Sequence, residues 1–138
     1  MGRRQARAAA MQMVYENMLG GHGGEDTLRG LIAFEPEEND QAYIDQILEG
    51  VGAHESELDG QISHLLKDWT LDRISRVNLA ILRVAVYEVT YHPFEVDDAS
   101  AVNEAVNLAQ KFDTPEGGRF VNGLLRNLLR EREGEAQS

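Results

Sequence analysis

The sequence predicts an all-α fold in a single domain. Most of the chain carries apolar residues at helical spacing, and residues 77–89 are apolar almost all round. The 138 residues suffice for one hydrophobic core, whereas two domains would each be marginal. We therefore expect residues 1–131 to form one helical domain. Residues 132–138 carry no apolar side chain larger than Ala, and we expect them to form a disordered tail.

The N-terminal third is expected to contain one long helix and one short helix. Residues 3–19 have helical apolar spacing, and the glycines within residues 20–24 end this helix. Asp26 or Thr27 can cap a short second helix that continues to Ile32. The acidic residues around Pro36 then favour a solvated linker.

Two further helices are expected before the central segment. Their apolar stripes are Tyr43, Ile44, Ile47, Leu48 and Val51, and then Leu58, Ile62, Leu65 and Leu66. Gly50 and Gly52 loosen the end of the first of these helices.

A central helix is expected over residues 72–91. Asp72 is a plausible cap, and Pro93 ends the pattern. The pattern is too long for a strand, because strands rarely exceed about ten residues. The other helices should pack around this segment.

Two charged residues, Arg83 and Glu88, interrupt the apolar central helix. They can be edge residues, members of an internal ion pair, or part of a docking face for another protein. Edge placement is favoured because charged side chains are mostly exposed in folded proteins.

Two amphipathic helices are expected at the end of the domain. Their stripes are Val102, Ala105, Val106, Ala109 and Phe112, and then Val121, Leu124, Leu125 and Leu128. The second of these helices follows a Thr114-Pro115 start signal.

The charge distribution limits the partners that the chain can bind. A net charge of -11 argues against a nonspecific phosphate binder. Residues 25–59 hold eleven acids and one arginine, whereas residues 1–24 have a net charge of +2. Because the Debye length is about 8 Å at physiological salt, the basic start can act locally if the acidic block lies elsewhere.

Several classes of function are disfavoured by the residues present. The chain has no cysteine, and His54 lacks the second histidine of a zinc-protease helix, since Leu58 stands four residues later. His22, His64 and His92 show neither ligand spacing nor a catalytic order. We expect no catalytic site, metal or cofactor. No secretory or membrane-spanning segment is found, so we expect a cytoplasmic protein.

The first helix carries a candidate RNA-binding face. Arg3, Arg4 and Arg7 cluster at its start, and Tyr15 lies two turns beyond Arg7. Guanidinium groups bind phosphates, and each base stacked on an aromatic ring contributes about 1–3 kcal/mol. Cations are disfavoured at this positive end of the helix dipole, and a bound anion would relieve the repulsion. The alternative is an ordinary soluble terminus.

A second candidate face lies at the start of the last helix. Arg119, Phe120 and Asn122 follow Gly117 and Gly118, beside exposed N–H groups that favour anions. The alternative is an ordinary helix start with Phe120 buried.

Four separated segments resemble the NusB family. They are RRQARAAAMQMVYE, WTLDRISRVNLAILRVAVYEV, VNEAVNLAQKF and RFVNGLL, and their order and spacing agree over nearly the whole chain. The resemblance implies an all-helical bundle of about seven helices. The chain departs from the commoner pattern at Asp113, where glycine often follows Lys-Phe, and at Gly117-Gly118, where polar residues are frequent.

The resemblance also implies a function. Family members bind the boxA element of nascent ribosomal RNA together with NusE, a small-subunit ribosomal protein, and help RNA polymerase to ignore terminators. The motif positions imply RNA contacts by Arg3, Arg4, Arg7, Tyr15, Asn78, Arg119, Phe120 and Asn122. The alternative is a protein-only scaffold or homodimer of the same fold, with the arginine face as a subunit interface.

Overall fold

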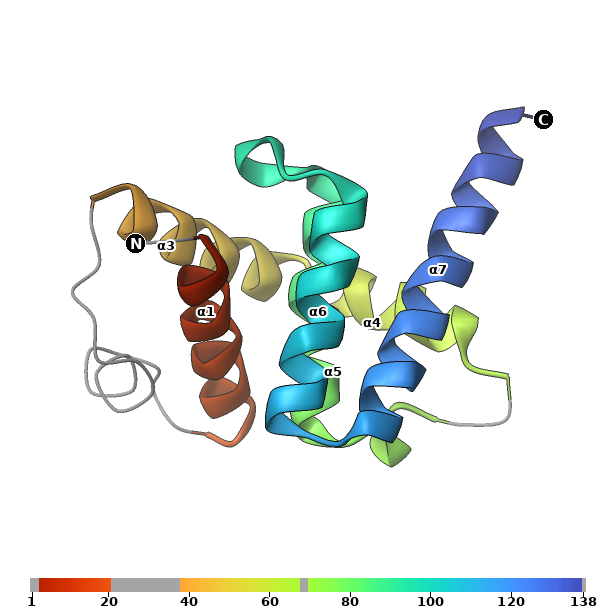
Figure 1. Ribbon diagram of the computed structural model, residues 1–138, viewed down its shortest axis with the longest axis horizontal. Helices are drawn as coiled ribbons and strands as arrows, with labels where there is room; N and C mark the ends of the chain where they lie inside the picture. The colour runs from red at the N-terminus through yellow and green to blue at the C-terminus, as the bar shows by residue number, and fades with distance from the viewer. Residues whose placement is uncertain (1–2, 21–37, 68–69, 138) are drawn as a thin grey trace.

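The computed structural model describes residues 3–20, 38–67 and 70–137, and it confirms the all-α fold class. Within these residues the chain forms six α-helices, two 3-10 helices and no strand. The elements are α1 (Arg3–Met18), α3 (Glu38–Ala53), α4 (Glu55–Leu65), η1 (Leu71–Arg73), α5 (Arg76–Tyr91), η2 (Pro93–Glu95), α6 (Asp98–Phe112) and α7 (Pro115–Gln137) (Figure 1). The short helix expected to end at Ile32 and the part of the linker before Glu38 lie outside the described residues. Glu38 and Asp40, which were expected in this solvated linker, belong instead to α3, and Asp40 is buried.

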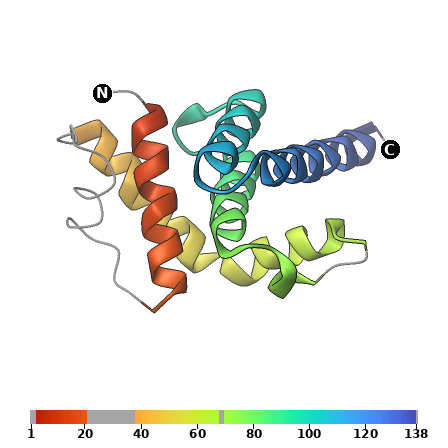
Figure 2. The ribbon, with the colours of Figure 1, turned by 60° about the horizontal axis from the view of Figure 1, so that its bottom comes forward.

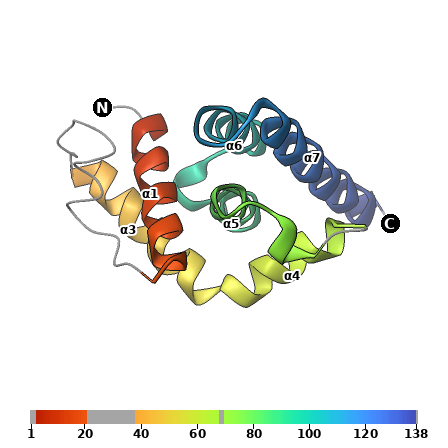
Figure 3. The same cartoon turned by 90° about the horizontal axis from the view of Figure 1, so that it is seen from below.

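Helix α5 is the centre of the fold. It packs against each of the other five α-helices, and Figure 3 shows it end-on between them. Residues 80–82 and 84–86 are buried, so most sides of the helix are covered. The predicted central helix is therefore confirmed, but its start differs. Asp72 belongs to η1, and Ser75 caps α5 by accepting a hydrogen bond from the backbone N–H of Asn78 at 3.1 Å.

The remaining helices pack on opposite sides of α5. Helix α1 packs across α3 on one side, and α6 pairs with α7 on the other (Figure 2). The buried face of α6 consists of Ala101, Val102, Ala105, Leu108 and Ala109. Three of these five side chains are alanine, and such small residues let neighbouring helices approach closely.

The last helix is longer than the sequence predicted. Helix α7 continues to Gln137, so the expected disordered tail at residues 132–138 is wrong for residues 132–137. The Arg132 guanidinium donates hydrogen bonds to the Val89 carbonyl (2.8 Å), Thr90 Oγ1 (2.7 Å) and Gln61 Oε1 (2.6 Å). Arg132 thus anchors the beginning of this segment, which has no large apolar residue, to α5 and α4.

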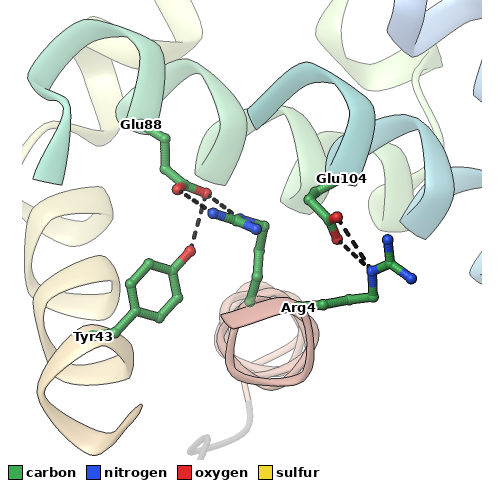
Figure 4. Close-up of polar contacts among 5 residues, drawn as sticks. Arg4, Tyr43, Glu88 and Glu104 are labelled. Atoms are coloured by element: carbon green, nitrogen blue, oxygen red, sulfur yellow. Dashed lines mark hydrogen bonds and ion pairs between the residues drawn. The ribbon is translucent and has the colours of Figure 1, made fainter. Parts of the chain in front are cut away.

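A buried ion pair joins three helices in the interior. Arg7 of α1 donates from Nε and Nη2 to the two carboxylate oxygens of Glu88 in α5, at 2.7 and 2.9 Å (Figure 4). The hydroxyl of Tyr43 in α3 donates to Glu88 Oε1 at 3.0 Å. Burial and the charge of Glu88 raise the pKa of Tyr43 above its usual range. Burial alone would lower the pKa of Arg7, but the hydrogen bond to Glu88 and the electrostatic effects of Tyr43, Glu88 and Glu104 together outweigh burial and raise the pKa.

The second charged residue of α5 also forms ion pairs inside the molecule. Arg83 donates to both carboxylate oxygens of Asp59 at 2.8 Å, and its Nη1 lies 2.8 Å from Glu55 Oε1. The edge placement favoured for Arg83 and Glu88 is therefore wrong, since both are buried. Buried charges persist only with such partners, because an isolated charge would lose its hydration.

We predict that Arg7→Met destabilises the protein by roughly 3–5 kcal/mol, because it leaves the buried Glu88 carboxylate without its cation. Urea unfolding followed by circular dichroism measures the loss. Arg4→Met is the matched control, and it should cost less than about 1 kcal/mol because the ion pair of Arg4 with Glu104 is exposed on the arginine side. Equal unfolding free energies for the two variants would contradict a structural role for Arg7.

A second prediction concerns two glycines of α3. A Cβ at Gly50 would overlap the ring of Tyr87, so Gly50→Ala should destabilise the fold by about 1–3 kcal/mol through overpacking. A Cβ at Gly52 would meet no atom within 4 Å, so Gly52→Ala should stabilise by roughly 0.5–1 kcal/mol. Melting temperatures of the two variants should move in opposite directions, and a shift of the same sign would refute this packing.

Candidate nucleic-acid interface

Arg3, at the start of α1, lies between two aromatic rings. Its guanidinium carbon is 4.4 Å from the ring centroid of Tyr43 and 4.9 Å from that of Phe94. These cation–π contacts tie the first turn of α1 to α3 and to η2. Arg3 Nη1 is buried and has no hydrogen-bond partner among the described residues. Arg3 is therefore a half-buried cation held in place by aromatic side chains.

Arg4 is the most accessible arginine of this cluster. Its side chain is 72% exposed, and Nε lies 3.2 and 3.3 Å from the two carboxylate oxygens of Glu104 in α6. The two terminal nitrogens of Arg4 point away from this carboxylate (Figure 4). The outward edge of the guanidinium can therefore receive an anion while Glu104 orients its inner edge.

The structure changes the interpretation of the other residues of α1. Arg7 is 4% exposed and bonded to Glu88, so the prediction that it lies on an exposed RNA-binding face is wrong. The i, i+4 spacing of Arg3 and Arg7 places both residues on one face of α1, but this face packs against the core. Tyr15 is partly buried and packs against the hydrophobic core.

The connection between α6 and α7 is a tightly packed corner. Asn78 is 4% exposed, and its Nδ2 donates to Asp113 Oδ2 at 3.2 Å. The Thr114 hydroxyl accepts a hydrogen bond from the backbone N–H of Gly117 at 2.9 Å, which fits the predicted start of α7 at Thr114-Pro115. Asn78 therefore lies below the corner, where it holds Asp113 and is not available for direct contact with a ligand.

The two departures from the family pattern are coupled in this corner. A Cβ at residue 117 would overlap the Asp113 carboxylate and approach the Asn78 amide. Gly117 thus leaves the room that the Asp113 side chain needs.

The first turns of α7 contribute one exposed cation and one partly buried aromatic residue. Arg119 is exposed, whereas Phe120 packs partly against the core. Both line a shallow pocket of about 370 Å³ at the end of α4, together with Leu65, Leu66, Lys67, Gly123, Leu124 and Asn127. The side chain of Asn122 is not part of this lining, and its Oδ1 accepts a hydrogen bond from Arg126 at 2.9 Å.

The predicted site residues form two groups that the fold does not bring together. Helix α1 begins at the left of Figure 1, about halfway up, whereas α6 and α7 are connected at the bottom. The first group contains Arg3 and Arg4, and the second contains Arg119 and Phe120. Phe94, Glu104 and Lys67 also belong to these two groups but were not predicted as site residues. Of the three, only Lys67 could have been noticed in the sequence, because it is a cation directly after an apolar stripe.

The side chains of these groups suit an anionic ligand that has flat rings. Guanidinium groups bind phosphate oxygens, and aromatic rings stack on bases. Within the described part of the chain, no three histidine or acidic side chains gather to hold a metal ion. Of the helices that the structure describes, none is both long enough and apolar enough to cross a membrane.

Comparison with known proteins identifies similar chains. The NusB family model matches residues 4–130. The transcription antitermination protein NusB of Acetivibrio thermocellus is 37% identical over 131 residues, which cover 94% of this chain and 90% of the relative. NusB of T. maritima has a TM-score of 0.81 at 24% identity, covering 95% of this chain and 92% of that one. A NusB chain solved with NusE and double-stranded RNA has a TM-score of 0.77 at 23% identity, covering 94% and 96%.

Sequence and fold comparisons agree on one assignment. The family model covers both groups of candidate residues except Arg3. The structural similarity extends over nearly the whole length of each chain and supports the same fold independently. The chain belongs to the NusB family.

Proposed function

We propose that this protein is a cytoplasmic transcription antitermination adaptor that binds boxA-type single-stranded RNA of ribosomal RNA transcripts together with NusE. It acts on RNA polymerase through this assembly, and no bond is made or broken in its function. The observation that carries the proposal is the exposed Arg4, whose free guanidinium edge points outward at the start of α1. Family membership supports it, since the relatives are transcription antitermination proteins.

The partners are supported by a neighbour of the same fold. That neighbour was solved with NusE and double-stranded RNA. We propose a single-stranded ligand because stacking on an aromatic side chain requires an unstacked base, which an intact A-form helix does not offer. Arg3, Arg4, Tyr15, Arg119, Phe120 and Asn122 remain proposed RNA contacts. Arg7 and Asn78 contribute from beneath the surface, because both are buried.

The charge of Arg4 explains how an acidic protein can bind RNA. The net charge of -11 repels RNA at long range, so binding must depend on a few local contacts. Glu104 lies against Arg4 and reduces its positive potential. We therefore propose weak binding by the protein alone and stronger binding when NusE adds its own contacts.

We predict that Arg4→Gln weakens binding to a boxA RNA about fivefold to tenfold, the effect of losing roughly 1–1.4 kcal/mol from a phosphate contact. The log-log salt dependence should become less steep by roughly 0.7, because one phosphate contact is lost. Fluorescence anisotropy with a labelled RNA at several salt concentrations, with and without NusE, measures both changes. The melting temperature should stay the same.

The matched control is Arg130→Gln, which removes the same charge from an exposed position of α7. It should leave RNA affinity nearly unchanged. If neither the native protein nor its mixture with NusE prefers boxA RNA to a scrambled sequence, the proposal fails. Loss of dimers in Arg4→Gln, measured by sedimentation, together with absence of RNA binding would instead support the scaffold or homodimer alternative.

A further inference from the structure

Phe94 is an exposed aromatic residue beside the arginine cluster of α1. It lies in η2, between α5 and α6, and 42% of the residue is exposed to solvent. Large aromatic side chains usually contribute to stability by being buried. The described residues include two other exposed large hydrophobic residues, Leu19 and Tyr91. The hydrophobic core therefore does not require the exposed ring of Phe94.

The backbone that carries Phe94 is strained. Phe94 and Glu95 each have a φ of 58°, and His92 has a φ of 47°. Residues with a Cβ rarely adopt this left-handed region, and each such residue costs about 1 kcal/mol or more. Strain of this kind clusters at ligand-binding positions. Residues 92–95 thus contain three non-glycine residues in the left-handed conformation. The turn that they form sets the position of the Phe94 ring.

The ring of Phe94 is braced by its neighbours. The Arg3 guanidinium carbon lies 4.9 Å from the ring centroid, and Tyr43 meets the ring in an edge contact with centroids 5.8 Å apart at 62°. These contacts fix the ring from the protein side and leave the exposed part to solvent. Arg4 is the next residue of the same helix turn, and its side chain extends to Glu104 of α6, so the arginine cluster continues beyond the Phe94 ring.

Tyr91 provides an internal contrast. It is 41% exposed, nearly as much as Phe94, but its hydroxyl donates to Glu57 at 2.7 Å and its ring stacks on His54 at 4.6 Å. The Tyr91 ring thus contacts His54 and Glu57, whereas the Phe94 ring contacts the guanidinium of Arg3. Both rings have acidic residues nearby, since Glu95 follows Phe94 in the chain.

We propose that Phe94 is a stacking platform for one unpaired nucleobase, on the same RNA strand whose phosphate binds Arg4. The inference rests on the proposed RNA-binding function and adds a site to it. A base fits better than a protein partner because a single partly exposed ring offers far less area than the roughly 800 Å² that protein interfaces bury on each partner. Base stacking on one ring also tolerates any base, so this site adds affinity without reading sequence.

The test compares Phe94→Leu and Phe94→Trp with Tyr91→Leu. Phe94→Leu keeps an apolar side chain but removes the flat face, so affinity for boxA RNA should fall roughly fivefold to 100-fold, as expected for one lost stacking contact. Phe94→Trp should keep or improve the native affinity. Tyr91→Leu, which removes an equally exposed ring, should change affinity less than about twofold. Circular dichroism checks that each variant is folded.

A set of RNAs with one abasic position each identifies the stacked base. One abasic RNA should bind the native protein as weakly as Phe94→Leu binds the intact RNA, and that RNA should show no further loss with Phe94→Leu. Additive losses at every position would overturn the proposal. If Phe94→Leu weakens NusE binding but leaves RNA affinity unchanged, the ring is a protein contact and the inference fails. If Arg4→Gln weakens RNA binding and Phe94→Leu does not, this inference fails while the proposed function stands. If the native protein does not bind RNA, with or without NusE, both fail.

Discussion

The buried contact between Arg7 and Glu88 is the constraint on which the candidate interface depends. It joins α1 to α5, and the Tyr43 hydroxyl adds α3 to the same carboxylate. Removing water from two charges is costly, and only paired charges with further hydrogen bonds offset that cost. The packing of α1 on α5 is therefore restricted, because few orientations of the two helices keep the Arg7 guanidinium on the Glu88 carboxylate. Since Arg3 and Arg4 belong to the preceding turn of α1, their positions follow from this contact.

The arginines of α1 thus divide into a structural residue and surface residues. Arg7 stabilises the fold, Arg3 is held between aromatic rings, and Arg4 presents a free guanidinium edge to solvent. Glu104 limits the positive potential of Arg4, which suits a protein whose total charge is strongly negative. A site of this kind depends on a few precise contacts, so the proposed RNA binding would gain affinity from the contacts of a second protein, as expected of an adaptor in a larger assembly.

Helical periodicity was enough to predict the fold class and the central helix, because apolar spacing records which face is buried. It could not show that Arg7 and Glu88 meet, since a charged side chain looks the same in sequence whether it is paired inside or solvated outside. Asn78 was assigned to the RNA surface by its position in a family motif, which does not show that it lies beneath the corner between α6 and α7. Phe94 was missed because its importance comes from a left-handed turn and from Arg3, which lies 91 positions earlier in the chain. Such long-range contacts leave no periodic signal.

The proposed interface requires that RNA contacts Arg4 while Arg7 stays buried in the fold. Two-dimensional NMR of the arginine Nε–H groups during titration with boxA RNA tests it most directly, because each guanidinium gives its own signal. The Arg4 signal should shift progressively with added RNA, and the Arg7 signal should stay in place and exchange slowly with solvent. A shift of Arg7 with an unchanged Arg4, or rapid exchange at Arg7 in the free protein, would contradict the account.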